Sequence, residues 1–351
     1  MDAKLVGIDQ AEKWNDFVRL APRGHILHSY QWGLFKGEFG WQPRFWAVQD
    51  GDRFLGAILV QIRRLPLGLA LAYSPRGPIV HPEDGTVARM LLDAAIADAK
   101  SLGASILKVD PLVEVGQNDF WGDVLGKRGF KPSGLQIQPR KTVITDLTAS
   151  EEEILARFER THRYNVRLAE RRGVTVTPSE DFECFYELLR ETSQREHFLL
   201  HSREYFARMS DILHSGGLAQ IVIARREGKA LAAGMIFLYG KHAYYPYGGS
   251  SAEGREHKAA QALQWGAMQW AKLHGAMDYD FWGLPVTDSG VLKGVAAFKK
   301  GFGGRIVEYE PARDYAVRKV SSRLFRALIW LQIRWRNLRT HGSLQSPLGE
   351  S

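Results

Sequence analysis

Hydrophobic and polar positions along this chain follow two periods, which together predict a mixed α/β fold. Apolar residues alternate on both sides of the turn at Gly51 and predict a β-hairpin. Over residues 86–102 the apolar positions recur at helical spacing, and Gly103 follows as a typical helix end. The short apolar run 105–110 then predicts a buried strand, which stops at Pro111 because proline cannot donate to a strand ladder.

The same order of elements occurs twice. Gly103 and Gly275 each follow a helical run and precede a strand (275 − 103 = 172), and Gly129 and Gly301 each lie in a basic-Gly-Phe triplet (301 − 129 = 172). We infer a tandem duplication of one α/β unit. Because open α/β sheets bind ligands in crevices, we expect a cleft between or along the two copies.

The second copy repeats the plan of the first. The pattern predicts helices over 151–172, 182–195, 202–214 and 258–274, a hairpin across Gly228 and a strand that ends at Trp282. A strand over 141–147 closes the first copy, and Ser150 then caps the next helix. The predicted domains are therefore 1–149, 150–339 with a basic amphipathic helix from residue 317, and a flexible tail over 340–351.

Composition adds limits on class and partners. The chain has 351 residues, enough for two domains, and its 45% hydrophobic content excludes a disordered protein. The net charge of +8 favours a polyanionic partner such as RNA, nucleotide or acidic lipid, and we expect no DNA partner. Cys184 is the single cysteine, and the histidines lack metal-ligand spacing, so we expect no metal and no cofactor. The absence of a long apolar run predicts a cytoplasmic protein whose membrane contact is peripheral at most.

An ordered set of motifs carries a family resemblance. The second copy contains Arg163-Tyr164-Asn165-Val166-Arg167, Tyr247-Gly248-Gly249-Ser250-Ser251, Asp280-Phe281-Trp282-Gly283 and Phe298-Lys299-Lys300-Gly301-Phe302-Gly303-Gly304; the first contains His28-Ser29-Tyr30-Gln31-Trp32-Gly33, Arg76-Gly77-Pro78 and Asp110-Pro111. Over nearly the whole chain this set resembles the FemABX family of peptidoglycan bridge aminoacyltransferases.

The resemblance implies two GNAT-like domains of mixed α/β fold. It implies aminoacyl-tRNA as donor and a UDP-linked or lipid-linked muramyl-pentapeptide as acceptor, with transfer to an amine of the stem peptide. Some members carry a long helical arm in the second domain, and no segment of this sequence has the length for one.

Lys299 and Asp110 are the candidate catalytic residues. The resemblance places Lys299 near the end of the acceptor channel, where a cation meets either the tRNA terminus or the oxyanion of the tetrahedral intermediate. Composition alone favours a solvated Lys299-Lys300 pair. Asp110 ends the central strand of the first copy, where a carboxylate can orient or deprotonate the attacking amine. The alternative for Asp110 is a simple Asp-Pro turn.

Substrate binding is assigned to cations and aromatic residues. Lys36 matches the family position for the acceptor diphosphate, and Arg203 is the second candidate because the family's usual arginine position holds His201 here. Aromatic side chains that contact the acceptor or pack in the core complete the set: Tyr205, Tyr247, Phe298 and Trp32.

Two basic helices are candidates for polyanion contact. Residues 157–172 include Arg163 and Arg167, which either attract tRNA phosphates or form a solvated face. The helix over 317–339 mixes arginines with apolar residues, and it either lies on an anionic membrane or packs on its own domain.

Two other functions stay open. An acyl-CoA-dependent N-acyltransferase has the same fold, and Gly248-Gly249-Ser250-Ser251 precedes a helix, although the usual arginine-and-glycine spacing for a pyrophosphate is absent. A non-catalytic tRNA-binding module would bind RNA without transfer.

Overall fold

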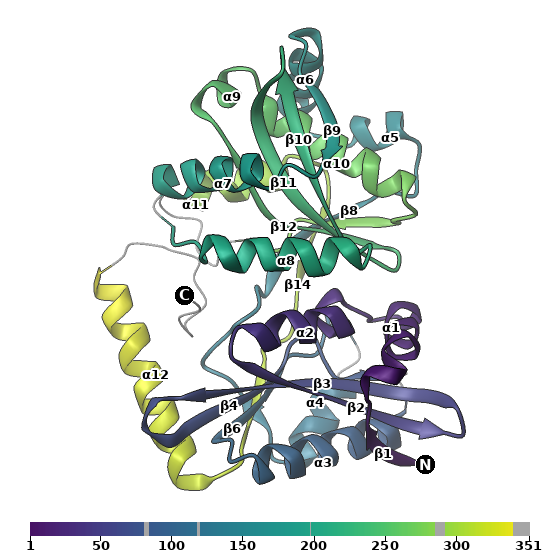
Figure 1. Ribbon diagram of the computed structural model, residues 1–351, viewed down its shortest axis with the longest axis vertical. Helices are drawn as coiled ribbons and strands as arrows, with labels where there is room; N and C mark the ends of the chain where they lie inside the picture. The colour runs from purple at the N-terminus through teal and green to yellow at the C-terminus, as the bar shows by residue number, and fades with distance from the viewer. Residues whose placement is uncertain (81–83, 118–119, 197, 285–291, 340–351) are drawn as a thin grey trace. The chain divides into compact units, whose positions relative to one another are not determined.

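The computed structural model describes residues 1–80, 84–117, 120–196, 198–284 and 292–339 (Figure 1). They form two compact units, each a mixed sheet with helices on both faces. Unit 1 consists of Met1–Arg140 together with Glu308–Arg339, and unit 2 runs from Lys141 to Val307.

Unit 1 contains an eight-stranded sheet in the order β1-β2-β3-β4-β6-β15-β7, with β5 paired to β3. Its strands are β1 (Asp2–Leu5), β2 (Trp41–Asp50), β3 (Arg53–Leu65), β4 (Leu69–Ser74), β5 (Ile79–Val80), β6 (Ile106–Val109), β7 (Lys131–Pro132) and β15 (Arg313–Ala316). Its helices are α1 (Ala11–Leu20), α2 (Tyr30–Glu38), α3 (Gly85–Ser101), α4 (Phe120–Lys127) and α12 (Lys319–Arg339). Strands β4 and β6 are the parallel pair among the described strands of unit 1, with Ser74 opposite Val109 at the end of the pair.

The alternation along β2 sends neighbouring side chains to opposite faces of the unit 1 sheet. Phe45 packs against Trp14 of α1 and Tyr30 of α2, with ring centroids 5.1 and 4.1 Å away. Val48 belongs to the core cluster that α3 and α4 cover on the other face. The hairpin at Gly51 and the helix before Gly103 are therefore confirmed.

Unit 2 contains a seven-stranded sheet in the order β14-β8-β13-β12-β11-β10-β9. Its strands are β8 (Lys141–Asp146), β9 (Thr175–Ser179), β10 (Ala219–Arg226), β11 (Lys229–Tyr239), β12 (His242–Ser250), β13 (Asp278–Asp280) and β14 (Arg305–Glu308). Its helices are α5 (Glu151–Ala156), α6 (Arg160–Arg171), α7 (Phe182–Glu196), α8 (Arg203–Ser215), α9 (Ala252–Glu256), α10 (Ala259–Leu273) and α11 (Leu292–Lys300). The lengths of these helices show no long helical arm among the described residues.

Helices cover both faces of the unit 2 sheet. A side chain at Gly234 would meet Leu263 of α10, whereas one at the next position of the neighbouring strand, Gly249, would meet Leu188 of α7. The core on the α10 side also contains Val166 of α6. Thus α6 and α10 share one face, and α7 lies on the other.

The prediction of one continuous helix over 151–172 is wrong at the centre of that range. It breaks into α5 and α6 at Arg157–Glu159, where Glu159 adopts an extended conformation. The Glu159 amide leaves the helix and donates to the carbonyl of Gly301 at 2.9 Å. A tertiary hydrogen bond therefore outweighs the local helical pattern.

The duplication is visible in the positions of the elements. Strands β6 and β13 start 172 residues apart (278 − 106 = 172), as do strands β8 and β15 (313 − 141 = 172). Nevertheless, β8 pairs with β13 in unit 2, and β15 pairs with β6 in unit 1. Each sheet is completed by the last strand of the other copy.

Because the two copies exchange β8 and β15, the compact units divide the chain at other positions than the predicted domains do. The predicted domains split at 149/150, whereas the compact units place Lys141–Asp146 in unit 2 and return Glu308–Arg339 to unit 1. The predicted tail, 340–351, lies outside the described residues. Among the described helices, none has the length and apolarity to cross a membrane.

Candidate active site

The parallel strands β12 and β13 of unit 2 separate after a short pairing. They are paired from His242 opposite Asp278 to Tyr244 opposite Asp280, and there β13 ends. Strand β12 continues to Ser250, and among the described residues its strand partner beyond Tyr244 is β11. The end of β13 is therefore the point where the parallel pair of unit 2 diverges, while the chain after it still bonds to β8 through the Phe281 and Leu284 amides.

A buried carboxylate organises the turn after β13. Asp280 accepts a hydrogen bond from the Thr142 hydroxyl and another from the Trp282 amide at 2.7 Å. The Thr142 hydroxyl also accepts from the Gly283 amide at 3.0 Å. Trp282 has φ +57°, in the left-handed region that bulky residues rarely adopt. These bonds hold the backbone in that conformation.

Lys299 brings a cation to this turn. It lies in the last turn of α11, and its Nζ donates to the carbonyls of Phe281 at 2.7 Å and Gly283 at 2.8 Å. Burial lowers the pKa of the Lys299 ammonium from 10.5 to about 8, and the Asp280 carboxylate partly opposes this shift. Composition alone favours a solvated Lys299-Lys300 pair. In the structure the Lys299 ammonium instead donates to two backbone carbonyls.

A chain of aromatic contacts connects two predicted substrate-binding residues with the same turn. The Tyr205 ring stacks on His201 and touches Phe206 edge-on. Phe206 lies 4.9 Å from Tyr247, and Phe237 lies between Tyr247 and Trp282, at 6.5 and 5.9 Å. Tyr205 is buried, whereas Tyr247 is half-buried. The fold thus groups Tyr205, Tyr247 and Lys299 in one region of unit 2.

Phe298 precedes Lys299 on α11. Its half-buried ring packs edge-on against Phe302 at 5.1 Å, and its carbonyl accepts from His162 at 3.0 Å. Phe298 thus anchors α11 to the core of unit 2.

Arg203 has a different environment from the one expected. Its guanidinium forms a two-bond ion pair with Glu183 at the surface and lies 5.5 Å above the Phe182 ring. Phosphate binding by Arg203 would require exchange of the Glu183 carboxylate for the ligand. The diphosphate role of Arg203 stays a prediction.

The two predicted tRNA contacts differ in their surroundings. Arg167 is exposed on α6. Arg163 is half-buried and donates to the carbonyl of Ala156 at 2.7 Å, which ties the start of α6 to the end of α5. One nitrogen of the Arg163 guanidinium is therefore already engaged in a hydrogen bond within unit 2.

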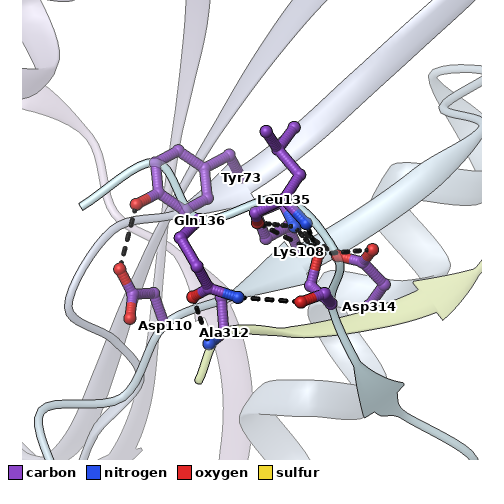
Figure 2. A network of polar contacts seen from close by, with 8 residues as sticks. Tyr73, Lys108, Asp110, Leu135, Gln136, Ala312 and Asp314 are labelled. Atoms are coloured by element: carbon purple, nitrogen blue, oxygen red, sulfur yellow. Dashed lines mark hydrogen bonds and ion pairs between the residues drawn. The ribbon is translucent and has the colours of Figure 1, made fainter. Parts of the chain in front are cut away.

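Asp110 belongs to a separate polar network in unit 1 (Figure 2). It follows β6, lies 3.5 Å from Arg76 and accepts from the Tyr73 hydroxyl at 3.2 Å. Burial raises the pKa of the Asp110 carboxyl, and the charge of Arg76 opposes that shift. A raised pKa suits a general base, but the same contacts serve a structural ion pair. Its catalytic role stays a prediction.

Lys36 and Trp32 both lie on α2 of unit 1 and are buried. The Lys36 ammonium is 5.6 Å from the centre of the Trp41 ring, and the Arg63 guanidinium lies at the same distance from that ring. Two cations therefore face one indole, in cation–π contact. The Trp32 ring packs 5.4 Å from Phe35.

Sequence reasoning missed Thr142 and gave no role to Asp280. The motif Asp280-Phe281-Trp282-Gly283 contained the signal, because an aspartate at the end of a strand accepts from the backbone of the following turn. Thr142 carried no such signal, since it is 138 residues away in sequence from the carboxylate it contacts.

With this geometry established, comparison with known proteins gives the family. The FemAB family model matches residues 10–229 and 219–328. The chain belongs to the FemAB family. Among curated relatives, the lipid II:glycine glycyltransferase of Staphylococcus saprophyticus is 29% identical over 88% of this chain and 92% of its own length. The Staphylococcus aureus (strain MRSA252) protein of the same name is 28% identical over 86% and 90%.

Solved structures agree on the fold. A crystal structure of FemX superposes with a TM-score of 0.86 at 27% identity, covering 93% of this chain and 100% of FemX. A tandem GNAT protein from the clavulanic acid biosynthesis pathway has a TM-score of 0.54 at 13% identity, covering 90% of this chain and 99% of its own. The predicted FemABX resemblance and tandem GNAT-like fold are confirmed.

The structure also bears on the proposed CoA loop of this FemAB protein. Gly248 and Gly249 lie within β12, paired with Gly234 and Ala233, and Gly249 packs against the backbone of Leu188. These glycines allow close packing of strand and helix. They do not form a phosphate-binding loop before a helix, so this segment gives no support to an acyl-CoA-dependent enzyme.

Proposed function

We propose that this FemAB protein transfers an aminoacyl group from aminoacyl-tRNA to an amine of a peptidoglycan-precursor stem peptide. The observation that carries the proposal is the Lys299 ammonium, held by the carbonyls of Phe281 and Gly283 beside the end of β13. These bonds use two of its three donors. The third has the chemistry to stabilise an oxyanion.

The chemistry requires one bond to form and one to break. The stem-peptide amine attacks the ester carbonyl of the donor, and the carbonyl oxygen takes negative charge. The attacking amine loses a proton, the ester bond breaks, and the terminal ribose oxygen of the RNA takes up a proton and leaves as a hydroxyl. A cation fixed before the reaction begins lowers the barrier, because it needs no reorganisation when charge develops.

The acceptor is proposed from the relatives, which are named lipid II:glycine glycyltransferases. A lipid-linked precursor carries a diphosphate. Lys36 is a candidate to bind it through its ammonium charge, and Arg203 is a candidate to bind it through two guanidinium nitrogens. Asp110 is the candidate base for the attacking amine. Trp32, Tyr205, Tyr247 and Phe298 remain the aromatic candidates for acceptor contact.

A lipid-linked acceptor makes peripheral membrane contact part of the proposal. Helix α12 exposes an apolar row at i, i+4 and i+11: Val320, Leu324 and Leu331, exposed by 81, 43 and 46%. Arg323 and Arg326 are exposed beside this row. Apolar side chains flanked by cations are the features by which a helix binds an anionic bilayer surface.

The test is a transfer assay with radiolabelled aminoacyl-tRNAs and two acceptors, UDP-linked muramyl-pentapeptide and lipid II. Label transfer to either acceptor supports the function. Transfer from aminoacyl-tRNA to neither, with robust acyl transfer from an acyl-CoA, would overturn it.

A further inference from the structure

Helix α6 of unit 2 has two faces with different surroundings. His162, Val166 and Ala169 are buried, and Val166 and Ala169 pack in the core that α10 also lines. On the solvent side the spacings of four, three and four residues place one row along the helix. The row consists of Arg160, Tyr164, Arg167 and Arg171, all exposed.

The chemistry of this row suits a nucleic acid backbone. It presents three guanidinium groups, and the Tyr164 side chain between them is 57% exposed. The guanidinium of Arg171 lies 5.9 Å from the Tyr164 ring. Glu170 is the single acidic residue of α6. Arginines bind phosphates, and an exposed aromatic ring stacks on bases or sugars.

An anionic membrane fits the row less well. A helix that lies in the bilayer interface inserts large apolar side chains, and this row has Tyr164 alone between arginines. RNA is therefore the occupant that the side chains favour.

The buried face of α6 contacts the last turn of α11, which carries Lys299. His162 Nε2 donates to the carbonyl of Phe298 at 3.0 Å, and because a carbonyl only accepts, the proton lies on Nε2. Just before α6, the Glu159 amide donates to the carbonyl of Gly301 at 2.9 Å. These two bonds fix the residue before Lys299 and the residue two positions after it.

Side chains and backbone are closely packed where the start of α6 contacts the residues after α11. A Cβ at Gly301 would lie 2.1 Å from the His162 ring, and a Cβ at Gly303, where φ is +71°, would lie 2.2 Å from the carbonyl of Arg157. The Phe302 ring packs edge-on 4.8 Å from His162. A shift of the α6 N-terminus is therefore transmitted to the last turn of α11.

We infer that the solvent row of α6 receives the RNA body of the donor, and that His162 is the positioning residue that couples this docking to Lys299. The inference rests on the proposed aminoacyl-tRNA donor and names the surface that binds it. Helix α6 would then bind RNA phosphates on its solvent face and contact the last turn of α11, with Lys299, on its buried face.

The docking half is tested with the triple variant Arg160→Gln/Arg167→Gln/Arg171→Gln. Arg190→Gln is the matched control, because Arg190 is an equally exposed arginine on α7, on the other face of the sheet. The KM for aminoacyl-tRNA should rise at least about tenfold in the triple variant, with a shallower salt dependence, whereas an aminoacylated CCA trinucleotide should show no change. The control should match the wild type with both donors.

The coupling half is tested at His162. His162→Leu should lower kcat with both donors while leaving the KM for aminoacyl-tRNA near the wild-type value. His162→Gln keeps an amide donor for the Phe298 carbonyl and should restore most of kcat. Equal thermal midpoints of the two variants separate positioning from loss of fold. Equal kcat values for Leu, Gln and wild type would overturn the coupling.

Binding of uncharged tRNA, measured by fluorescence anisotropy, keeps the docking testable without catalysis. Weaker binding by the triple variant supports the surface even if no transfer occurs, in which case the proposed function alone fails. Unchanged tRNA affinity and unchanged KM overturn the surface. Loss of binding to phosphatidylglycerol vesicles with unchanged tRNA affinity also overturns it, in favour of a membrane contact.

Discussion

Lys127 and Lys299 occupy equivalent positions in the two copies, 172 residues apart (299 − 127 = 172), and their environments are opposite. Both lie at the end of a helix and precede a basic-Gly-Phe triplet. The Lys127 side chain is 75% exposed and pairs with Asp123 on its own helix at 2.7 Å. Lys299 instead reaches the carbonyls after β13. One duplicated position is thus a surface residue in unit 1 and a half-buried, carbonyl-bound cation in unit 2.

This difference predicts a matched pair of variants. Lys299→Met should lower kcat by about 100- to 1000-fold, the usual loss when one oxyanion donor is removed. Lys127→Met removes the same charge at the equivalent position and should leave kcat within about twofold, because an exposed i, i+4 ion pair contributes little. Steady-state kinetics with circular dichroism as a folding check compares them. Similar activity of both variants would remove the role of Lys299.

The lowered pKa of Lys299 predicts the alkaline limb of the activity profile. Since the pKa is about 8 instead of 10.5, the ammonium is present below pH 8 and is lost as the pH rises above it. The rate constant kcat should therefore fall above pH 8. In Lys299→Arg the guanidinium stays charged, so any residual activity should lack this limb. A wild-type kcat that is constant up to pH 10 would contradict the assignment.

His28 predicts a loss of stability in acid. Burial lowers the pKa of the imidazole from 6.5 to about 3, so the folded protein keeps His28 neutral while the unfolded chain takes up a proton. The free energy of unfolding should be at its full value above pH 6.5 and should fall as the pH drops toward 3. Urea unfolding between pH 7.5 and 5 measures the slope. His28→Gln, which does not titrate, should have a smaller slope than the wild type.

The exchanged strand β15 predicts an asymmetric mutant series. Lys108 on β6 is buried and donates to Asp314 of β15 at 2.6 Å, with Ser133 completing the group (Figure 2). Asp314→Ala leaves an unpaired buried ammonium and should lower the free energy of unfolding by about 3–5 kcal/mol. The double variant Lys108→Met/Asp314→Leu should recover much of this loss. Guanidinium unfolding of the wild type and the two variants measures these free energies, and a double variant no more stable than Asp314→Ala would contradict a coupled pair.

The apolar row of α12 predicts binding to anionic vesicles. Leu324→Ser/Leu331→Ser removes two exposed apolar side chains and should reduce flotation with phosphatidylglycerol vesicles. Val115 is exposed by 50% outside α12, so Val115→Ser is a control for general loss of hydrophobicity. Equal flotation of all three proteins would exclude α12 as the contact.

Local pattern was sufficient for most elements and for the family. The positions of α3, α7, α8 and α10 agree with the predicted helices within one residue at each end, because amphipathic periodicity and the following glycine act over a few residues. The family motifs identified Lys299, Tyr205 and Tyr247, and the fold brings them into one region of unit 2. The same reasoning gave Arg163 an open surface and missed its bond to the Ala156 carbonyl.

The sequence by itself determined the duplication, the order of helices and strands, and the chemical groups available to the site. Tertiary structure alone decided that β8 completes the sheet of unit 2 and β15 that of unit 1, that the chain leaves the helix at Glu159, and that Lys299 is half-buried and bound to two carbonyls while Lys127 is exposed. The physical reason is range. Periodicity reports the few residues that share a turn or a strand, whereas the partners of β8, β15 and Glu159 lie more than a hundred residues away and the carbonyls that hold Lys299 lie 18 and 16 residues away.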